Sequence, residues 1–327
     1  MATACGDSGH ASVTETPPRG ARRPPSILVV IPSHNGGELT VSCLERLLPQ
    51  LREGDRVVVV DNGSWDGSAQ TIRKRFDGEV PVIRHRRPLG FGPACNLGAT
   101  GTRADLILFL NQDLLLSPDG LATLRESADL RPGAIIGALL FGPEGMQVQH
   151  AGGIILPNAL TEHPHRGVAA GELPRMGFVT CDYVTGALFM VRADIFRALG
   201  GFDERFRPAY YEETDFCVRA RARGIPSLVA LRVTARHFEA VVMGRDSPRY
   251  HRAYHRNRLR FVMKHYTRHA IRTAFVPAER RWRHSALSAS ARRAVFHAYA
   301  ATLLESPRWV FERRRRPPSF APQEVAP

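Results

Sequence analysis

The chain has 327 residues, of which 43% are hydrophobic, enough to build the core of one large domain or two modest ones. Its five cysteines show no C-x-x-C spacing, which argues against a disulfide framework and a zinc site and fits a reducing compartment. No apolar run is long enough to cross a bilayer, and residues 1–25 hold no apolar signal core. We therefore expect a cytoplasmic protein that begins with a disordered segment over residues 1–25.

Positive charge is concentrated at the end of the chain. The formal net charge is +14, and residues 245–327 carry 19 Lys and Arg against five Asp and Glu, whereas residues 1–244 are balanced. This difference predicts a neutral body followed by a basic tail.

Strands and helices alternate through the first third of the chain. Apolar runs predict buried strands at residues 26–31, 56–60, 80–84 and 104–110, with helical patterns between them at 38–51, up to residue 76, and at 90–101. This alternation predicts an α/β fold with a mostly parallel central sheet flanked by helices. Ligands bind beyond the carboxyl ends of such strands, where Pro32, Asp61 and Asp113 lie.

The middle of the chain is less regular. Residues 133–156 look strand-like with Gly and Pro interruptions, and residues 157–177 predict a long loop. Further elements are expected in the order strand 184–191, helix 193–199, helix 213–223 and strand 227–231. The second of these helices begins inside an acidic stretch.

Two acidic residues follow buried strands. Asp113 ends the segment NQD at 111–113. A carboxylate in that position suits a divalent cation that bridges two phosphates, although an ordinary surface turn gives the same pattern. Asp61 opens the turn DNGS, where its carboxylate either accepts a hydrogen bond from a nucleobase or forms an Asx turn.

A glycine-rich segment follows the third strand. Gly90, Phe91 and Gly92, with Asn96 on the next helical turn, either let a ligand approach the backbone closely or simply begin a helix. A dinucleotide-binding fingerprint would follow the first strand, so this position excludes a dehydrogenase of that type.

Three carboxylates, those of Glu212, Glu213 and Asp215, lie at a predicted helix start, which capping and the helix dipole explain in part. Flanking tyrosines predict a partly enclosed site, where one carboxylate stays basic enough to take a proton from an alcohol. His237 is either a structural histidine or, together with Asp113, a ligand of an Mn²⁺-like ion.

Taken in order, these motifs resemble the family-two glycosyltransferases of the GT-A fold, and among them most closely the bacterial rhamnosyltransferase-like enzymes of cell-envelope polysaccharide assembly. The similar stretches are ILVVIPSHNG, VVVVDNGSWDG, PLGFGPACNLG, LILFLNQDLLL, VTGALFMVRADIFRALGGFDERF, YYEETDFCVRARARG and RNRLRFVMKH. The resemblance covers residues 26–265, so we expect one GT-A domain over that range and a basic amphipathic helical tail over 266–327.

The resemblance implies roles for individual residues. It implies a metal site at Asp113 and His237, with Mg²⁺ or Mn²⁺ as the ion. It places Glu213 as the general base, with Glu212 and Asp215 as the other catalytic candidates. Gly186 would border the acceptor. The nucleotide-sugar would be held by Pro32, Asn35, Asp61, Gly90, Phe91, Asn96 and Asn111, with Asp61 on a uracil or thymine ring.

Three residues depart from the usual pattern of the family that the chain resembles. Asn111 replaces the first acid of its D-x-D motif, Glu213 replaces its usual aspartate, and Leu89 stands where an asparagine is common. The longer Glu213 side chain must therefore be accommodated by local geometry, and one hydrogen bond to the nucleotide is in question.

The resemblance implies an inverting, metal-dependent glycosyltransferase that uses a dTDP- or UDP-type sugar donor, with rhamnose as the leading sugar. Its acceptor would be a hydroxyl of a glycan or lipid-linked molecule in cell-envelope polysaccharide assembly. The alternatives are a sugar nucleotidyltransferase, which would need a basic glycine-rich segment near the first strand, and a nucleic-acid-binding protein. A nucleic-acid-binding protein would explain the positive charge but not the acidic residues that follow successive strands, so we expect no nucleic-acid partner.

The basic tail has two interpretations. Apolar residues are spaced among its arginines, Trp309 lies near the end, and Arg313 to Arg316 follow. Such segments suit an anionic membrane surface, which predicts a peripheral protein at the inner face of the cell membrane. The alternative is a helix that packs on the body.

Overall fold

The computed structural model describes residues 23–174, 176–238, 247–284 and 288–315, with residues 290 and 306–315 as helical backbone only. Most of the N-terminal segment that we expect to be disordered lies outside these ranges, as do the side chain of Trp309 and the side chains of the arginine run at 313–316.

A central sheet with the strand order β10-β12-β6-β11-β4-β1-β2-β3 forms the body. Strands β1 (Ile27–Ser33), β2 (Arg56–Asn62), β3 (Val82–His85) and β4 (Leu106–Leu110) pair in parallel, as do β6 (Ile135–Phe141) and β12 (Ser227–His237). Within this order, β10 (Phe178–Cys181) and β11 (Leu188–Arg192) run antiparallel to the strands beside them. The predicted α/β fold with a mostly parallel sheet is therefore confirmed.

Helices cover both faces of this sheet because its central strands are apolar on both sides. One core lies beneath α1 (Gly37–Leu47), α2 (Ser68–Arg75) and α4 (Gly120–Leu130). The other lies beneath α3 (Phe91–Ala99), α5 (Ala193–Ala198) and α6 (Glu212–Arg221). The remaining short elements are η1 (Leu48–Gln50), β5 (Leu114–Leu116), β7 (Val148–His150), β8 (Ile154–Ile155) and β9 (Thr161–Glu162).

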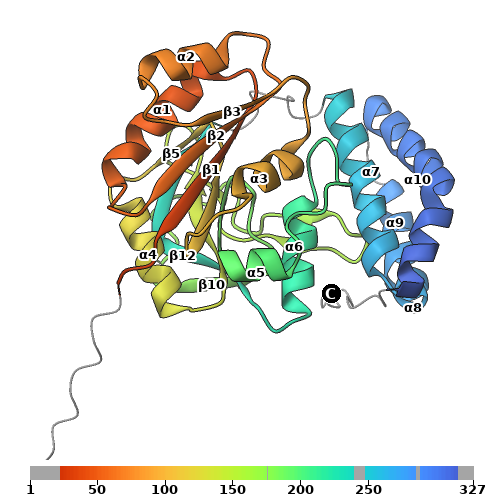
Figure 1. Ribbon diagram of the computed structural model, residues 1–327. Coiled ribbons are helices and arrows are strands. Elements are labelled where there is room, and N and C mark those ends of the chain that lie inside the picture. Colours follow the sequence, from red (N-terminus) through yellow and green to blue (C-terminus); the bar gives the residue numbers. More distant parts are fainter. Residues whose placement is uncertain (1–22, 175, 239–246, 285–287, 316–327) are drawn as a thin grey trace, which may run out of the picture.

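The C-terminal helices gather at one side of the body, beyond α6 (Figure 1). They are α7 (Pro248–His265), α8 (Arg268–Ala270), η2 (Ile271–Phe275), α9 (Val276–Arg283) and α10 (Ala289–Arg315). Ala294, Val295 and Ala298 of α10 are buried, and α10 lies along α7. Among the described residues, no helix combines the length and apolar character needed to span a membrane.

A buried ion pair joins these helices to one another. The guanidinium of Arg258 on α7 is fully buried and makes two hydrogen bonds of 2.7 Å to the carboxylate of Glu279 on α9. Tyr299 of α10 donates a further hydrogen bond to the same carboxylate. The boundary expected near residue 265 therefore falls between helices that share one polar network.

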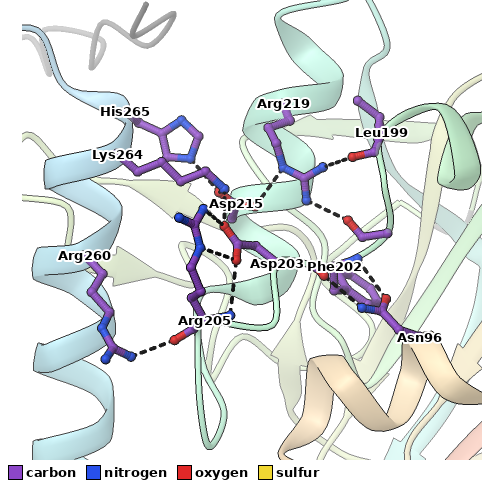
Figure 2. A network of polar contacts seen from close by, with 11 residues as sticks. Asn96, Leu199, Phe202, Asp203, Arg205, Asp215, Arg219, Arg260, Lys264 and His265 are labelled. Atoms are coloured by element: carbon purple, nitrogen blue, oxygen red, sulfur yellow. Dashed lines mark hydrogen bonds and ion pairs between the residues drawn. The ribbon is translucent and has the colours of Figure 1, made fainter. Parts of the chain in front are cut away.

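A second network fixes α6 against α7 (Figure 2). The carboxylate of Asp215 is fully buried and contacts Lys264 at 2.5 Å, His265 at 2.7 Å and Arg219 at 2.8 Å. Lys264 also binds Asp203 at 2.7 Å, which connects the network to the loop before α6. Because these ion pairs hold α6 against α7, the first turn of α6 has a defined position.

Candidate active site

One cavity of about 1260 Å³ opens at the carboxyl ends of β1, β2 and β4, where the sequence places the ligand site. It is large enough for a nucleotide carrying a sugar. The predicted residues that line it are Pro32, Asn35, Gly90, Phe91, Asn111, Asp113, Gly186, Glu212, Glu213 and His237. Asp61, Asn96 and Asp215 do not line it.

Hydrogen bonds between the ends of β1 and β2 shape one end of the cavity. Asn35 adopts a left-handed conformation with φ of 47°, and its N–H donates to the Ser64 hydroxyl at 2.9 Å. Its side-chain oxygen accepts from the N–H of Trp65 at 3.1 Å. Trp65 is 76% exposed and contacts the ring of His34 edge-on. Sequence reasoning missed His34 and Trp65, because only the fold brings these two turns together.

Asp61 is fully buried behind this end of the cavity. One carboxylate oxygen accepts a hydrogen bond at 3.0 Å from the N–H of Ser64, three residues on, which closes the turn after β2. The other oxygen lies 3.3 Å from Nε of Arg84. Its interactions thus support the turn that carries Trp65.

The glycine segment allows two close approaches. Gly90 has φ of 100°, and a Cβ atom there would lie 2.8 Å from the carbonyl oxygen of Pro208. A Cβ atom at Gly186 would lie 2.9 Å from the ring of Phe91, so this glycine lets Phe91 reach the cavity wall. Asn96 faces away and exchanges two hydrogen bonds of 2.9 Å with the backbone of Phe202.

Asp113 and His237 meet in the cavity, with Oδ1 of Asp113 lying 3.3 Å from Nε2 of His237. The opposite ring atom, Nδ1, is 2.7 Å from Oε1 of Gln149, which can only accept, so Nδ1 carries the proton. In the neutral ring Nε2 therefore carries a lone pair, which faces a carboxylate oxygen of Asp113. The amide of Asn111 lies 3.4 Å from the same Nε2.

A cation fits between these two atoms. Oδ1 of Asp113 is buried without a hydrogen-bond partner in the described part of the chain. Two facing lone pairs repel unless a positive charge lies between them. Gln149 orients the ring of His237, and such an orienting residue is usual beside a ligating histidine at metal sites. No group of three or more His, Cys, Asp or Glu side chains in the described ranges could hold a metal. An ion here would therefore need further ligands from a diphosphate and water, as Mg²⁺ commonly does.

Glu212 and Glu213 face the cavity from the first turn of α6. Tyr210 and Tyr211, just before them, have φ of 79° and 74°, a left-handed arrangement that turns the chain sharply into the helix. Burial raises the pKa of Glu213 to about 7. Burial, together with the charge of Glu213, raises the pKa of Glu212 well above its usual value. Both carboxyl groups thus keep their protons to a higher pH than an exposed glutamate does, and Glu213 gains or loses its proton near neutral pH.

A pair of histidines that sequence reasoning did not identify also lines the cavity. Nδ1 of His150 lies 2.6 Å from Nδ1 of His163, and Nε2 of His150 accepts from the Thr185 N–H at 3.3 Å. Burial, with the neighbouring His163, lowers the pKa of His150 well below its usual value, and burial lowers that of His163 to about 4. Both rings are therefore neutral hydrogen-bonding groups at pH 7.

Comparison with known proteins identifies the family and the fold. The sequence profile described as "Glycosyl transferase family 2" matches residues 28–200. The chain is 27% identical, over 67% of its length and 79% of the relative's, to N-acetylglucosaminyl-diphospho-decaprenol L-rhamnosyltransferase of Mycobacterium tuberculosis. It is 26% identical, over 75% of its length, to the protein y4gI of Sinorhizobium fredii, of which it spans 28%.

Solved structures show the fold. The structure of GalNAc-T7 with UDP, GalNAc and Mn²⁺ matches 90% of this chain and 59% of that one, with a TM-score of 0.61 and 15% identity. The GT-A type of architecture predicted from the sequence is thus confirmed at the level of the fold.

Proposed function

The chain belongs to glycosyl transferase family 2, and on that basis we propose that it moves a sugar from a nucleoside diphosphate to an acceptor hydroxyl. One observation carries the proposal. The Asp113–His237 pair and the Glu212–Glu213 pair face a single cavity at the carboxyl ends of the strands. A transferase of this kind needs a site for the diphosphate and a base for the acceptor, and the cavity offers both.

Asp113 and His237 are the residues that would hold a divalent ion, Mg²⁺ or Mn²⁺. A bound ion of this charge neutralises the diphosphate as it leaves. The chain's own part is to present one carboxylate oxygen and one imidazole lone pair, with Gln149 fixing the tautomer of the ring.

Glu213 is our proposed general base. With a pKa of about 7 it exists partly as carboxylate at neutral pH, and it is basic enough to take the proton from the acceptor hydroxyl. Burial and the charge of Glu213 raise the pKa of Glu212, so Glu212 resists adding a second negative charge to the pocket. Attack from the side opposite the diphosphate would invert the configuration at the anomeric carbon, as in single-displacement glycoside hydrolysis.

The donor and acceptor are inferred from the chemistry of the relatives. The rhamnosyltransferase named above motivates rhamnose as the sugar. The dTDP- or UDP-type carrier is proposed from the resemblance of the sequence motifs. We propose a glycan or lipid-linked acceptor in cell-envelope polysaccharide assembly. His34 and Trp65 lie at the end of the cavity where we place the nucleobase, and we place the acceptor beside Gly186, which also lines the cavity.

We further propose that the protein works at an anionic membrane surface on the cytoplasmic side. Phe296, Leu303 and Leu304 on the outer face of α10 are 71%, 72% and 85% exposed, and Arg292 and Arg293 lie nearby on the same helix. Apolar side chains surrounded by arginines bind such surfaces by burial and by charge together.

A thermal-shift panel of nucleoside diphosphates with and without Mn²⁺ tests the donor assignment, because a ligand that binds the folded state raises Tm. We expect UDP or dTDP to raise Tm only when Mn²⁺ is present. A rise with GDP or ADP alone, or no rise with any nucleotide, would contradict the assignment.

A further inference from the structure

Two adjacent residues of β7 each hold a second residue that lines the cavity. Oε1 of Gln149 accepts a hydrogen bond from Nδ1 of His237 at 2.7 Å. The next residue, His150, faces His163, with their Nδ1 atoms 2.6 Å apart. The proposed ion site uses His237, but neither His150 nor His163 takes part in the transfer proposed so far.

Hydrogen bonds determine which nitrogen of each ring in this pair carries the proton. Nε2 of His150 accepts from the backbone N–H of Thr185 at 3.3 Å, so the proton of the neutral ring lies on Nδ1. That N–H faces Nδ1 of His163, which must therefore accept. The proton of neutral His163 consequently lies on Nε2. The hydrogen bonds thus run from Thr185 through His150 to His163 and leave an N–H group at the end.

The N–H group of His163 is available to a ligand. His163 lines the cavity, and within the described ranges its Nε2 makes no hydrogen bond. The rings of His150 and Tyr183 contact it edge-on, with centroids 4.8 Å and 6.1 Å away, so its orientation is fixed. A donor that loses water to a ligand costs free energy unless the ligand accepts a hydrogen bond. His163 therefore favours a ligand that places an oxygen atom against it.

On one side, the histidine pair adjoins the ion site. The residue that orients His237 and the residue that orients His163 are neighbours in the chain, Gln149 and His150. The sugar of a nucleotide-sugar is bonded directly to the diphosphate. A diphosphate held at the ion site therefore carries its sugar into the adjoining part of the cavity.

On the other side, the pair adjoins the proposed base. The ring of Tyr183 contacts His163 and also lines the cavity. Burial raises the pKa of Tyr183, and the nearby groups Tyr254 and Glu213 raise it further, which places Glu213 within electrostatic range of this ring. The transferred sugar must lie within reach of both the diphosphate site and the base, and His163 is connected to both.

We infer that the N–H at Nε2 of His163 binds an oxygen atom of the sugar being transferred, and that His150 is the positioning residue that fixes this N–H. The oxygen belongs to a hydroxyl or an acetamido group, because both accept a hydrogen bond from a neutral donor. The cavity then rejects a sugar that lacks this oxygen. The inference rests on the proposed function, since it takes the ion site to hold the diphosphate of the donor.

Calorimetric titration with UDP, dTDP and a panel of UDP- and dTDP-sugars in Mn²⁺ tests the contact. The ratio of the Kd of the nucleotide to the Kd of its sugar derivative measures what the sugar contributes. For the sugar with the largest ratio, His163→Phe should lower the ratio about three- to tenfold, because the ring stays but the N–H is lost, with binding of UDP or dTDP alone within about twofold of the parent.

Two further variants serve as controls for this titration. His163→Gln, which offers an amide N–H, should retain part of the ratio. His165→Phe removes a histidine of the same loop that does not line the cavity, and it should bind every nucleotide and sugar derivative as the parent does.

Deoxy analogues of the preferred sugar identify the oxygen. Loss of the oxygen that binds His163 should weaken binding to the parent but leave binding to His163→Phe unchanged, because the contact is already absent there. Loss of any other oxygen should weaken both proteins alike. Additive effects at every position would overturn the contact.

Nitrogen NMR of ¹⁵N-histidine-labelled protein tests the positioning role of His150, because a ring nitrogen that carries a proton differs in chemical shift from one that does not. In the parent, His163 should carry its proton on Nε2, whereas His237 carries it on Nδ1. His150→Phe should allow both tautomers of His163 and lower the sugar ratio, whereas a purely structural role would lower Tm and leave the tautomer unchanged. A proton on Nδ1 of His163 in the parent would overturn the inference whether or not any variant folds.

The same titrations distinguish failure of this inference from failure of the proposed function. Absence of UDP and dTDP binding to the parent would refute the proposed function. An unchanged sugar ratio in His163→Phe would overturn only the inference, since the ring would then contact the acceptor or no substrate. Loss of nucleotide binding in His163→Phe with unchanged Tm would assign the ring to the nucleotide and overturn the inference as well.

Discussion

The carboxylate of Asp113 and the imidazole of His237 lie 3.3 Å apart, although more than half of the body separates them in the sequence. The sheet explains this proximity. β5, which directly follows Asp113, pairs antiparallel with the end of β12, and His237 is in register with Leu114. Two residues from distant segments thus face one cavity because β5 begins beside the end of β12.

The first prediction concerns the diphosphate site. Asp113→Asn keeps the shape of the side chain but removes the charge that would hold a divalent ion. We expect it to lose Mn²⁺-dependent binding of UDP or dTDP, measured by calorimetry. The same change at Asp129, an exposed residue of α4, should leave binding unchanged. Equal binding by Asp113→Asn and the parent would remove Asp113 from the ion site.

The second prediction concerns the base. Glu213→Gln should lower turnover by about two orders of magnitude or more, with donor binding nearly intact. Since burial raises the pKa of Glu213 to about 7, the parent's kcat/KM should rise with pH up to about 7 and then level off. Steady-state rates from pH 5.5 to 8.5 test both points. If Glu212→Gln shows the larger loss, the base is the neighbouring residue.

The third prediction concerns Asp215. Burial alone would raise the pKa of Asp215, but the charges of Lys264 and Arg219 and a hydrogen bond from His265 outweigh it and hold the pKa well below its usual value. A depressed pKa stabilises the fold above the unfolded-state value of about 4, and this stabilisation is lost as pH falls toward the folded-state value. Asp215→Asn should lower the free energy of unfolding by about 3 kcal/mol at pH 7. Urea titrations should show the difference shrinking below pH 4, whereas a constant difference would contradict this account.

The fourth prediction concerns the C-terminal helices. Glu279→Gln leaves the buried guanidinium of Arg258 without its counter-charge, and removing one partner of a buried pair costs about 3–5 kcal/mol. The exposed pair of Arg75 and Glu45 gives the control, since Glu45→Gln should cost less than about 1 kcal/mol. Urea unfolding followed by circular dichroism compares the two. Similar midpoints for both variants would show that the pair does not couple α9 to α7.

Local pattern was sufficient for the parallel strands β1, β2, β3 and β4 and for the residues that follow them, but not for β5 and β10, nor for the extension of β12 from residue 231 to His237. Pro32 and Asp113 could be placed from sequence because an apolar strand fixes where its own end lies. The surroundings of Asp61, Asn96 and Asp215 could not be foreseen, because their partners come from other segments, such as Arg84, Phe202 and Lys264.

The contributions of four further cavity-lining residues could not be predicted from the sequence either; these are His34, Trp65, His150 and His163. Each of these rings contributes to the cavity through contact with a ring from another segment, as His34 contacts Trp65 and His150 contacts His163. No spacing along the chain signals such pairs.

Release of nucleoside diphosphate from a sugar donor tests the central proposal most directly. The purified protein is incubated with Mn²⁺ and a panel of dTDP- and UDP-sugars, with a membrane lipid extract as acceptor, and the products are separated by ion-exchange chromatography. We predict acceptor-dependent release of UDP or dTDP that is abolished by Asp113→Asn and strongly reduced by Glu213→Gln. Release of pyrophosphate instead, or equal release by the parent and Asp113→Asn, would contradict the proposed transfer.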